Sequence, residues 1–202
     1  QVDKGNADAM YNYANMLKNG EEGDPDLSGA RAWYKKAVDK GNALAMNNYA
    51  LMLQYGQGGA QDHLGAREWY KKAADLGLAS AMNNYAVMLQ YGQGGAQDHL
   101  GARAWYKKAA DKGKAAAMYN YANMLNLGQG GKQDLSGARA WYKKAADKGN
   151  ALAMNNYAVM LQYGQGGDPD LSGARAWYKK AADKGDAIAM NNYAFMLKKG
   201  QG

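Results

Sequence analysis

The sequence predicts an all-α protein: a right-handed superhelical α-solenoid of helix–turn–helix repeats, with five full units and a terminal half unit. The five tryptophans, Trp33, Trp69, Trp105, Trp141 and Trp177, recur every 36 residues, and residues 52–67 and 88–103 are identical. One such unit cannot bury its apolar face, but stacked units can. We therefore expect a single solenoid domain over 1–202. Its repeats would be 5–40, 41–76, 77–112, 113–148 and 149–184, with a half repeat at 185–202.

The first helix of each unit is predicted from its two ends. In the second unit Asn42 is the expected N-cap, residues 43–55 contain neither Gly nor Pro, and Gly56 begins a glycine-rich break. Asparagine accepts hydrogen bonds from the first free N–H groups of a helix, and glycine adopts the left-handed conformation that often ends one. We expect a helix over 43–55 and over the equivalent residues of every unit.

The second helix of each unit begins after an aspartate. Asp62 has Asp at the equivalent position of every other full unit, as expected for an N-cap beside the positive end of a helix. This helix should run to about Leu76, where Gly77 stops it.

Helical periodicity separates a core face from an outer face in both helices. The predicted core contains Ala45, Met46, Tyr49, Ala50, Met52, Leu53 and Gly56 from the first helix, and Ala66, Tyr70, Ala73 and Ala74 from the second, together with the tryptophans. Alternating small and large side chains allow two helices to approach closely.

Composition narrows the function classes. The chain has a formal net charge of +7 and no cysteine, so it can form neither a disulfide nor a thiolate metal site, which favours a reducing, cytoplasmic location. No apolar stretch approaches roughly 18 residues and the start does not resemble a signal peptide, so we expect no membrane segment. The positive charge recurs in WYKKA segments, which predicts a solvated helix face rather than a nucleic-acid stripe.

The second unit contains, in order, Ala45, Tyr49, Ala50, Leu53, Gly56, Gly58, Asp62, Ala66, Trp69, Tyr70, Ala73, Ala74 and Gly77. In spacing and residue type this pattern resembles the Sel-one-like repeat, a relative of the tetratricopeptide repeat, and it holds in every unit. The family usually has Leu-Gly at Tyr49 and Ala50 and Tyr at Leu53, so the core packing departs from the standard one. The resemblance implies an adaptor or scaffold role in protein complexes, without catalysis.

The first helix varies between units mainly at the positions of Leu44, Asn47, Leu51, Gln54 and Tyr55, on one arc opposite the predicted core. Several units carry apolar residues there, which indicates contact with a partner. The matching positions of the tetratricopeptide family line a concave groove, so the resemblance places a protein or peptide ligand on that face. The candidate ligand-binding residues are Tyr11, Asn12, Asn15, Leu44, Asn47, Asn48, Leu51, Tyr55, Asn83, Asn84, Val87, Tyr91, Tyr119, Asn120, Asn123, Asn155, Asn156, Val159 and Tyr163.

An unbroken column of asparagines lies within this set, at Asn12, Asn48, Asn84, Asn120, Asn156 and Asn192. An amide both donates and accepts, so the column could hold a peptide backbone regardless of its sequence. Alternatively, each asparagine bonds the neighbouring repeat and only positions the helices. The sequence does not separate these two hypotheses.

Residues typical of catalysis are scarce. His63 and His99 are the only histidines, and no carboxylate or thiol is fixed beside them, so we expect no metal site and no nucleophilic triad. The segment 128–134 lacks the Gly-Lys-Ser/Thr ending of a phosphate-binding loop. We expect no enzymatic activity and no cofactor.

Three functions remain open. The leading hypothesis is a protein- or peptide-binding adaptor, and the second is an engineered or consensus-like scaffold without a natural ligand, because the units are nearly identical. The third and least favoured is nucleic-acid binding through Arg31, Lys35 and Lys36, for which the affinity should fall steeply with salt concentration.

The half unit also predicts end-to-end self-association, since Ala189, Tyr193 and Leu197 lack the second helix that follows their equivalents. We name these three residues the predicted end surface.

Overall fold

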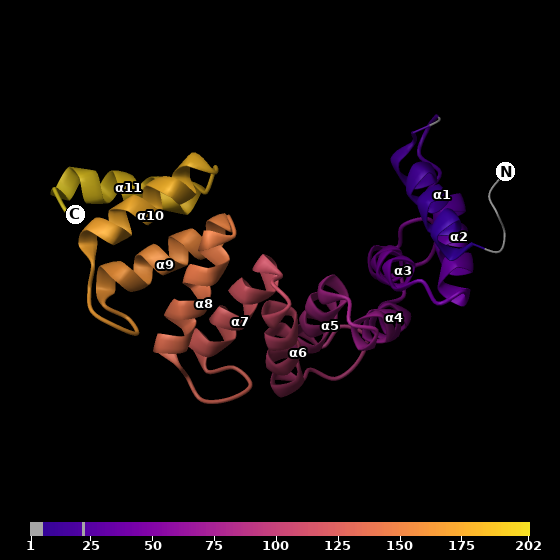
Figure 1. Ribbon diagram of the computed structural model, residues 1–202, viewed down its shortest axis with the longest axis horizontal. Helices are drawn as coiled ribbons and strands as arrows, with labels where there is room; N and C mark the ends of the chain where they lie inside the picture. Colours follow the sequence, from indigo (N-terminus) through magenta and orange to yellow (C-terminus); the bar gives the residue numbers. More distant parts are fainter. Residues whose placement is uncertain (1–5, 22) are drawn as a thin grey trace. The chain divides into compact units, whose positions relative to one another are not determined.

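The computed structural model describes residues 6–21 and 23–202. Within these residues it contains eleven α-helices of 13 residues each and no strand (Figure 1). The helices are α1 Ala7–Asn19, α2 Leu27–Asp39, α3 Ala43–Tyr55, α4 His63–Asp75, α5 Ala79–Tyr91, α6 His99–Asp111, α7 Ala115–Leu127, α8 Leu135–Asp147, α9 Ala151–Tyr163, α10 Leu171–Asp183 and α11 Ala187–Lys199. Odd-numbered helices are the first helices of the repeats, and even-numbered helices are the second.

Both predicted types of helix start are confirmed in the second repeat. The side chain of Asn42 accepts a hydrogen bond from the backbone N–H of Ala45 at 2.7 Å, and α3 begins at Ala43. Asp62 accepts from the backbone N–H of Gly65 at 2.8 Å, and α4 follows it. Gly56 ends α3 with a φ of 66°, in the left-handed region that glycine tolerates.

A second loop glycine allows neighbouring repeats to approach closely. Gly94 has a φ of 68°, and a Cβ atom placed on it would lie 2.1 Å from the carbonyl oxygen of His63, at the start of α4 in the preceding repeat. Gly58 and Gly166 make the same approach to Leu27 and Leu135. Because backbone atoms surround this position, only a residue without a Cβ fits. The glycine-rich loop therefore serves packing between repeats as well as helix termination.

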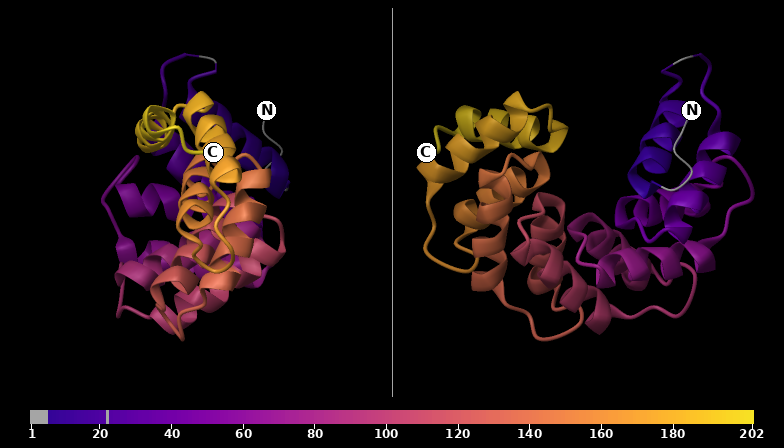
Figure 2. Two further views of the ribbon diagram at one scale, coloured as in Figure 1. Left: turned by 90° about the vertical axis from the view of Figure 1, so that its left-hand side faces the viewer. Right: turned by 45° about the vertical axis from the view of Figure 1, so that its right-hand side comes forward.

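The helices cluster into two compact units, Gln1–Trp105 and Tyr106–Gly202, and the boundary falls within α6. In the first unit each helix from α1 to α5 packs against the next. In the second unit α7 to α11 do the same, and α10 lies between α9 and α11 (Figures 1 and 2). The single domain over 1–202 and the repeat bounds stay predictions.

Most of the predicted core is confirmed. Buried residues of the second repeat are Ala45, Met46, Ala50, Met52, Leu53, Ala66, Tyr70, Ala73 and Ala74. The exceptions are Tyr49 and Gly56, which are only half-buried. Each described repeat places one tyrosine of its second helix at the centre, and Tyr70 is fully buried.

The tryptophans lie at the edge of the core, which corrects the prediction that they are part of it. Trp69 is half-buried and packs edge-on against Tyr49, with 6.1 Å between the ring centroids. The Lys72 ammonium lies 3.9 Å from the centre of the Trp69 ring. Alanines and Tyr70 fill the fully buried positions of the same helix. The larger Trp69 ring therefore lies outside these positions, in contact with Tyr49 and with the solvated ammonium of Lys72.

Candidate ligand-binding surface on the first helices

Apolar side chains are exposed along one side of the first helices. Leu44 and Tyr55 stand on the same side of α3, since 11 residues correspond to about three turns, and Tyr91 takes the position of Tyr55 in α5. The exposed apolar side chains at these two positions of the first helices are here named the first-helix surface. It comprises Leu44, Tyr55 and Tyr91 in the first unit and Leu127, Leu152, Tyr163 and Ile188 in the second. The tyrosines among them are 63–67% exposed.

The structure places the predicted ligand-binding residues in three environments. Exposed are Asn12, Leu44, Tyr55, Tyr91 and Tyr163; half-buried are Tyr11, Asn15, Asn47, Asn48, Leu51, Asn84, Val87, Tyr119, Asn120, Asn123, Asn156 and Val159. Asn83 and Asn155 are buried, and so is Gln54. The prediction that these three positions face outward is wrong, because the next repeat packs against this arc of the first helix.

Hydrogen bonds between side chains link the first helices of the first unit. Asn84 donates to Asn47 of the preceding repeat at 3.1 Å, and Asn47 donates to Asn48 at 3.2 Å. Asn48 donates to the hydroxyl of Tyr34 at 3.4 Å, and that hydroxyl donates to Asn15. One continuous chain of bonds thus joins α5, α3, α2 and α1.

The second unit repeats this arrangement. Asn192 donates to Asn155 at 3.1 Å, and Asn155 donates to Asn156 at 3.3 Å. Asn156 is hydrogen-bonded to the hydroxyl of Tyr142, which in turn donates to Asn123. These contacts support the hypothesis that the asparagines position the helices. Direct binding of a ligand by the same amides stays a prediction.

The buried tyrosine hydroxyls use one of two acceptors, a feature that the sequence reasoning missed. Tyr70 donates to Gln54 at 2.9 Å, and Tyr178 makes the same bond to Gln162 at 2.8 Å. In the first and fourth repeats the acceptor is Asn15 or Asn123 instead. The signal was present in the sequence: repeats with asparagine at the Leu51 position lack glutamine at the Gln54 position. A buried hydroxyl needs a partner, so the two positions change together.

Burial also determines how these tyrosines ionise. Removal from water raises the pKa of Tyr142 to about 12, and the hydrogen bond from Asn156 only partly opposes this. Burial likewise raises the pKa of Tyr178 to about 12. For Tyr70 the pKa is raised further, again mainly by burial. These groups are neutral hydrogen-bonding centres of the core and have no property of a general base near neutral pH.

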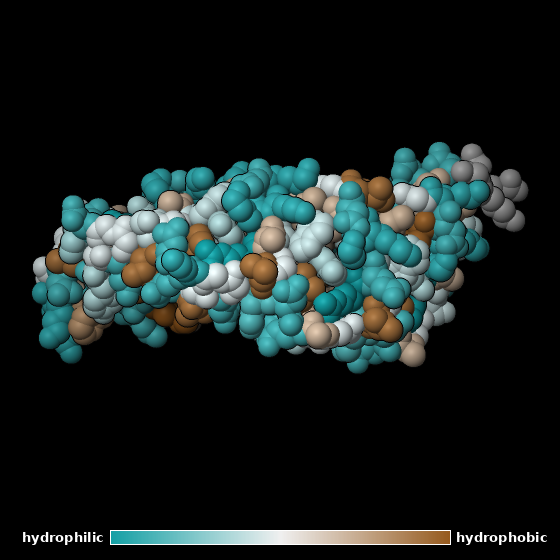
Figure 3. Space-filling view, turned by 90° about the horizontal axis from the view of Figure 1, so that it is seen from below, coloured by the Kyte–Doolittle hydropathy of each residue, from teal (hydrophilic) through white to brown (hydrophobic). Residues whose placement is uncertain are grey.

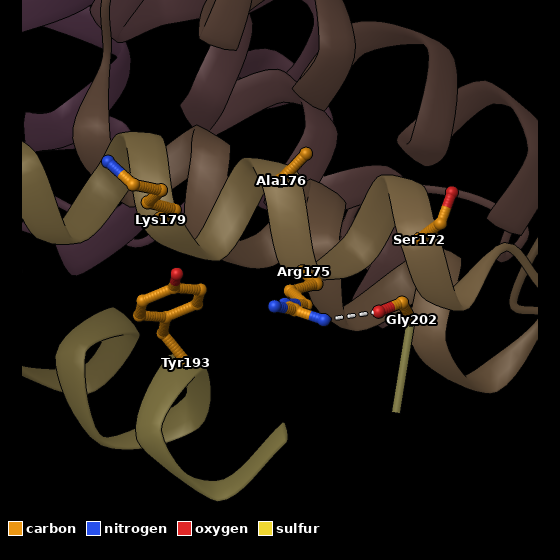
Figure 4. Close-up of a pocket in the computed structure, with 6 residues that line it drawn as sticks. All are labelled: Ser172, Arg175, Ala176, Lys179, Tyr193 and Gly202. Atoms are coloured by element: carbon orange, nitrogen blue, oxygen red, sulfur yellow. Dashed lines mark hydrogen bonds between the residues drawn. The ribbon is translucent and has the colours of Figure 1, made fainter. Parts of the chain in front are cut away.

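The recurrent arginines hold the loops of the following repeat. Arg31 donates to the backbone carbonyl of Ala60 at 3.0 Å. Arg67 and Arg139 make the equivalent bonds to Ala96 and Asp168. Arg175 of α10 donates to the carbonyl of Gly202 (Figure 4). The arginine column is therefore part of the packing between repeats.

The recurrent lysines also have partners within their own helix. Lys35 forms an ion pair with Asp39, and the same pair recurs in each of the other second helices. The Lys36 ammonium lies 3.8 Å from the centre of the Trp33 ring. Both contacts are solvent-exposed and contribute little to stability, but they spread the positive charge over separate helices.

The predicted end surface is only partly exposed. Leu197 is exposed, whereas Ala189 is fully buried because α11 packs against α10. Tyr193 is half-buried and, with Arg175 and Lys179, lines a cavity of about 310 Å³ (Figure 4). The prediction that Ala189 is uncovered is wrong, and end association through Tyr193 and Leu197 stays a prediction.

The described part of the chain offers neither a membrane-spanning helix nor a cluster of metal ligands. No helix there is both long and apolar enough to cross a bilayer. Among the same residues, no three side chains of His, Cys, Asp or Glu gather in a way that could hold a metal ion. On the face drawn in Figure 3, hydrophilic residues predominate and hydrophobic residues form small, separate patches.

The architecture and the repeat define the class of protein: an α-solenoid built from helix–turn–helix repeats. The sequence matches the Sel1 repeat at residues 7–42, 43–78, 79–114, 115–150 and 151–186, and in part at 187–202. The chain belongs to the Sel1 repeat family, whose repeats generally form non-enzymatic scaffolds for protein–protein interaction.

Solved structures share this fold. A Sel1 repeat protein from Oxalobacter formigenes has a TM-score of 0.91 and 32% identity, over 97% of this chain and 80% of that one. A protective antigen of uropathogenic Escherichia coli has a TM-score of 0.93 and 29% identity over 98% of this chain, which spans only 43% of the antigen. An immunity protein from Pseudomonas aeruginosa shares the fold at 21% identity and a TM-score of 0.59, over 91% of this chain and 67% of that one. No match was found among curated proteins.

Proposed function

We propose that this protein is a non-enzymatic adaptor that binds a protein or an extended peptide through the first-helix surface. The observation that carries the proposal is the exposure of Tyr55, Tyr91 and Tyr163, each 63–67% exposed at equivalent positions. Tyrosine is enriched in binding hot spots because it offers a large, rigid contact area and a hydrogen-bonding hydroxyl. Within the first unit, Tyr55 and Tyr91 lie at equivalent positions of neighbouring repeats, which suits a ligand that contacts both repeats.

The spacing of the repeats favours an extended ligand. Packed helices lie about 10 Å apart, and an extended chain advances about 3.3 Å per residue, so neighbouring repeats would meet every third ligand residue. Asn48 and Asn84 each donate one N–H to the preceding repeat and accept one hydrogen bond from the neighbouring asparagine of their own helix. A carboxamide has two N–H groups and two oxygen lone pairs, so both residues retain a donor and an acceptor for a peptide backbone.

Nucleic-acid binding is the weaker alternative. Arg31 is bonded to a loop carbonyl, Lys35 to Asp39, and Lys36 lies over Trp33. A phosphate would compete with the Ala60 carbonyl for Arg31 and with Asp39 for Lys35, which weakens any attraction between these cations and a nucleic acid.

A peptide-display selection on the folded protein, followed by substitution of the selected site, tests the proposal. Replacing Tyr55 and Tyr91 together by alanine should weaken the selected peptide by about 2 kcal/mol or more, roughly 30-fold. The matched control replaces Leu64 and Leu100 by alanine. These leucines are 61% and 72% exposed, but they stand on the second helices of the same unit.

The control pair should leave affinity within about twofold, and both variants should retain the helical circular-dichroism spectrum of the parent. Peptides that depend on Leu64 and Leu100 but not on the tyrosines would refute the proposed surface.

A further inference from the structure

A cavity opens between α7, α8 and α9 in the second unit, with a volume of about 140 Å³. It is lined by Asn126 of α7, Tyr142 of α8, Asn156, Val159 and Met160 of α9, and Gln165 in the loop after α9. None of these six side chains is charged, and three of them are carboxamides. The cavity therefore combines apolar contacts with neutral donors and acceptors.

The second repeat shows what normally fills this place. The equivalent residues there are Gln54, Tyr70, Asn84, Val87, Met88 and Gln93, so five of the six are identical and only glutamine replaces Asn126. The Gln54 carboxamide accepts from Tyr70 at 2.9 Å and donates to the side-chain oxygen of Gln93 at 2.9 Å. In this repeat the place is thus occupied by a carboxamide of the chain itself.

The fourth repeat removes that group without replacing it. Asn126 is one methylene shorter than glutamine, and Tyr142 donates to Asn123 instead. Within the described residues, neither the Asn126 nor the Gln165 side chain forms a hydrogen bond. The half-buried Asn126 and the exposed Gln165 thus have no side-chain partner among the described residues, and they line a space that the Gln54 carboxamide occupies in the second repeat.

We propose that the cavity lined by Asn126, Tyr142 and Gln165 binds a primary carboxamide, the side chain of an asparagine or glutamine in the bound ligand. This rests on the proposed function, and it adds a residue preference to it. A carboxamide can donate to one lining amide and accept from another. Gln54 likewise both accepts, from the Tyr70 hydroxyl, and donates, to the Gln93 amide. A carboxylate or an ammonium would lose water here without meeting an opposite charge on a lining residue.

Propionamide, which carries the end of a glutamine side chain, is the probe. It is titrated into protein with ¹³C-labelled methionine methyl groups while the Met160 signal is followed by NMR. A ligand of this size should give a saturable shift with a dissociation constant on the order of 1–100 mM. Propionate and propylammonium, which have similar shapes but carry charge, should bind at least about fivefold more weakly.

Two variants make the test specific. Asn126→Gln should abolish the Met160 shift, because the longer side chain fills the cavity as Gln54 does in the second repeat. We expect the variant to fold, since the second repeat already has glutamine at the equivalent position. The double variant Leu51→Asn with Gln54→Asn should create a propionamide response at Met88, since it supplies Tyr70 with the acceptor used in the fourth repeat. The double variant remains informative even if Asn126→Gln loses its fold.

Absence of a saturable Met160 shift in the parent protein would overturn the inference, as would an unchanged shift in Asn126→Gln or equal binding of propionate. These outcomes would leave peptide binding that depends on Tyr55 and Tyr91 intact, so the failure of the cavity is distinguishable from failure of the proposed function. The opposite result is also possible: propionamide binds as described, but no selected peptide depends on Tyr55 and Tyr91. That result would count against the proposed function and not against the cavity.

Discussion

Replacing Gly94 by alanine should separate the role of the loop glycine in repeat packing from its role in backbone conformation. The new Cβ would lie 2.1 Å from the His63 oxygen, 2.6 Å from the His63 carbonyl carbon and 2.9 Å from the Leu64 nitrogen. All three are backbone atoms and cannot rotate away, so the two repeats must move apart. We expect an overpacking cost of about 1–3 kcal/mol from this contact, in addition to about 1–2 kcal/mol for alanine in the left-handed region.

Gly92→Ala is the matched control. Gly92 has a φ of 65° against 68° for Gly94, but a Cβ atom there would have no neighbour closer than 3.2 Å. Both variants should therefore share the backbone cost, and only Gly94→Ala should carry the packing cost. Urea unfolding followed by circular dichroism at 222 nm gives both free energies. A difference between the two variants below about 0.5 kcal/mol would refute the reasoning about close approach.

Three further perturbations address the core. Tyr70→Phe should lower the free energy of unfolding by about 1–2 kcal/mol in urea titrations, because it leaves the buried oxygen of Gln54 without its donor; an unchanged midpoint would contradict this. Trp69→Ala should cost about 2 kcal/mol in the same assay, less than the 3–5 kcal/mol of a fully buried indole, and a loss in that higher range would return Trp69 to the core. Raising the pH should destabilise the fold between about pH 10 and 12, because the folded state holds the proton of Tyr142, whose pKa is raised to about 12, more tightly than the unfolded chain does. The loss should be smaller in Tyr142→Phe than in the parent, and equal losses would show that the alkaline transition has another cause.

The sequence predicts the helices well because their signals are local. Asn42, Asp62 and Gly56 act on backbone groups within a few residues of themselves, so one repeat read alone is sufficient to place them. The periodicity of alanine, tyrosine and methionine likewise identifies the face shared by the two helices of one repeat.

The outer arc is harder to predict because its environment is supplied by the next repeat. Gln54 lies far from the predicted core on a helical wheel, yet it is buried by contact with Tyr70 and with Gln93 of the next loop. Asn155 is buried in the same way and accepts from Asn192. A wheel drawn for one isolated helix contains no information about a neighbour 36 residues away.

The alternation between glutamine and asparagine acceptors was visible only as a correlation. Asparagine at the Leu51 position accompanies the loss of glutamine at the Gln54 position, and the structure shows that Asn15 and Asn123 accept from a tyrosine hydroxyl on the second helix. Because the buried tyrosine hydroxyl needs one acceptor, each full repeat has either asparagine at the Leu51 position or glutamine at the Gln54 position to supply it.

Site-specific photo-crosslinking tests the central claim, that ligands bind on the first-helix surface. A photoreactive phenylalanine analogue is placed at Tyr55 or Tyr91, and at Leu64 or Leu100 for comparison, and each protein is irradiated with a display-selected peptide. The account predicts crosslinked peptide from positions 55 and 91, competed by unlabelled peptide, and little from positions 64 and 100. Crosslinking mainly from positions 64 and 100 would contradict it.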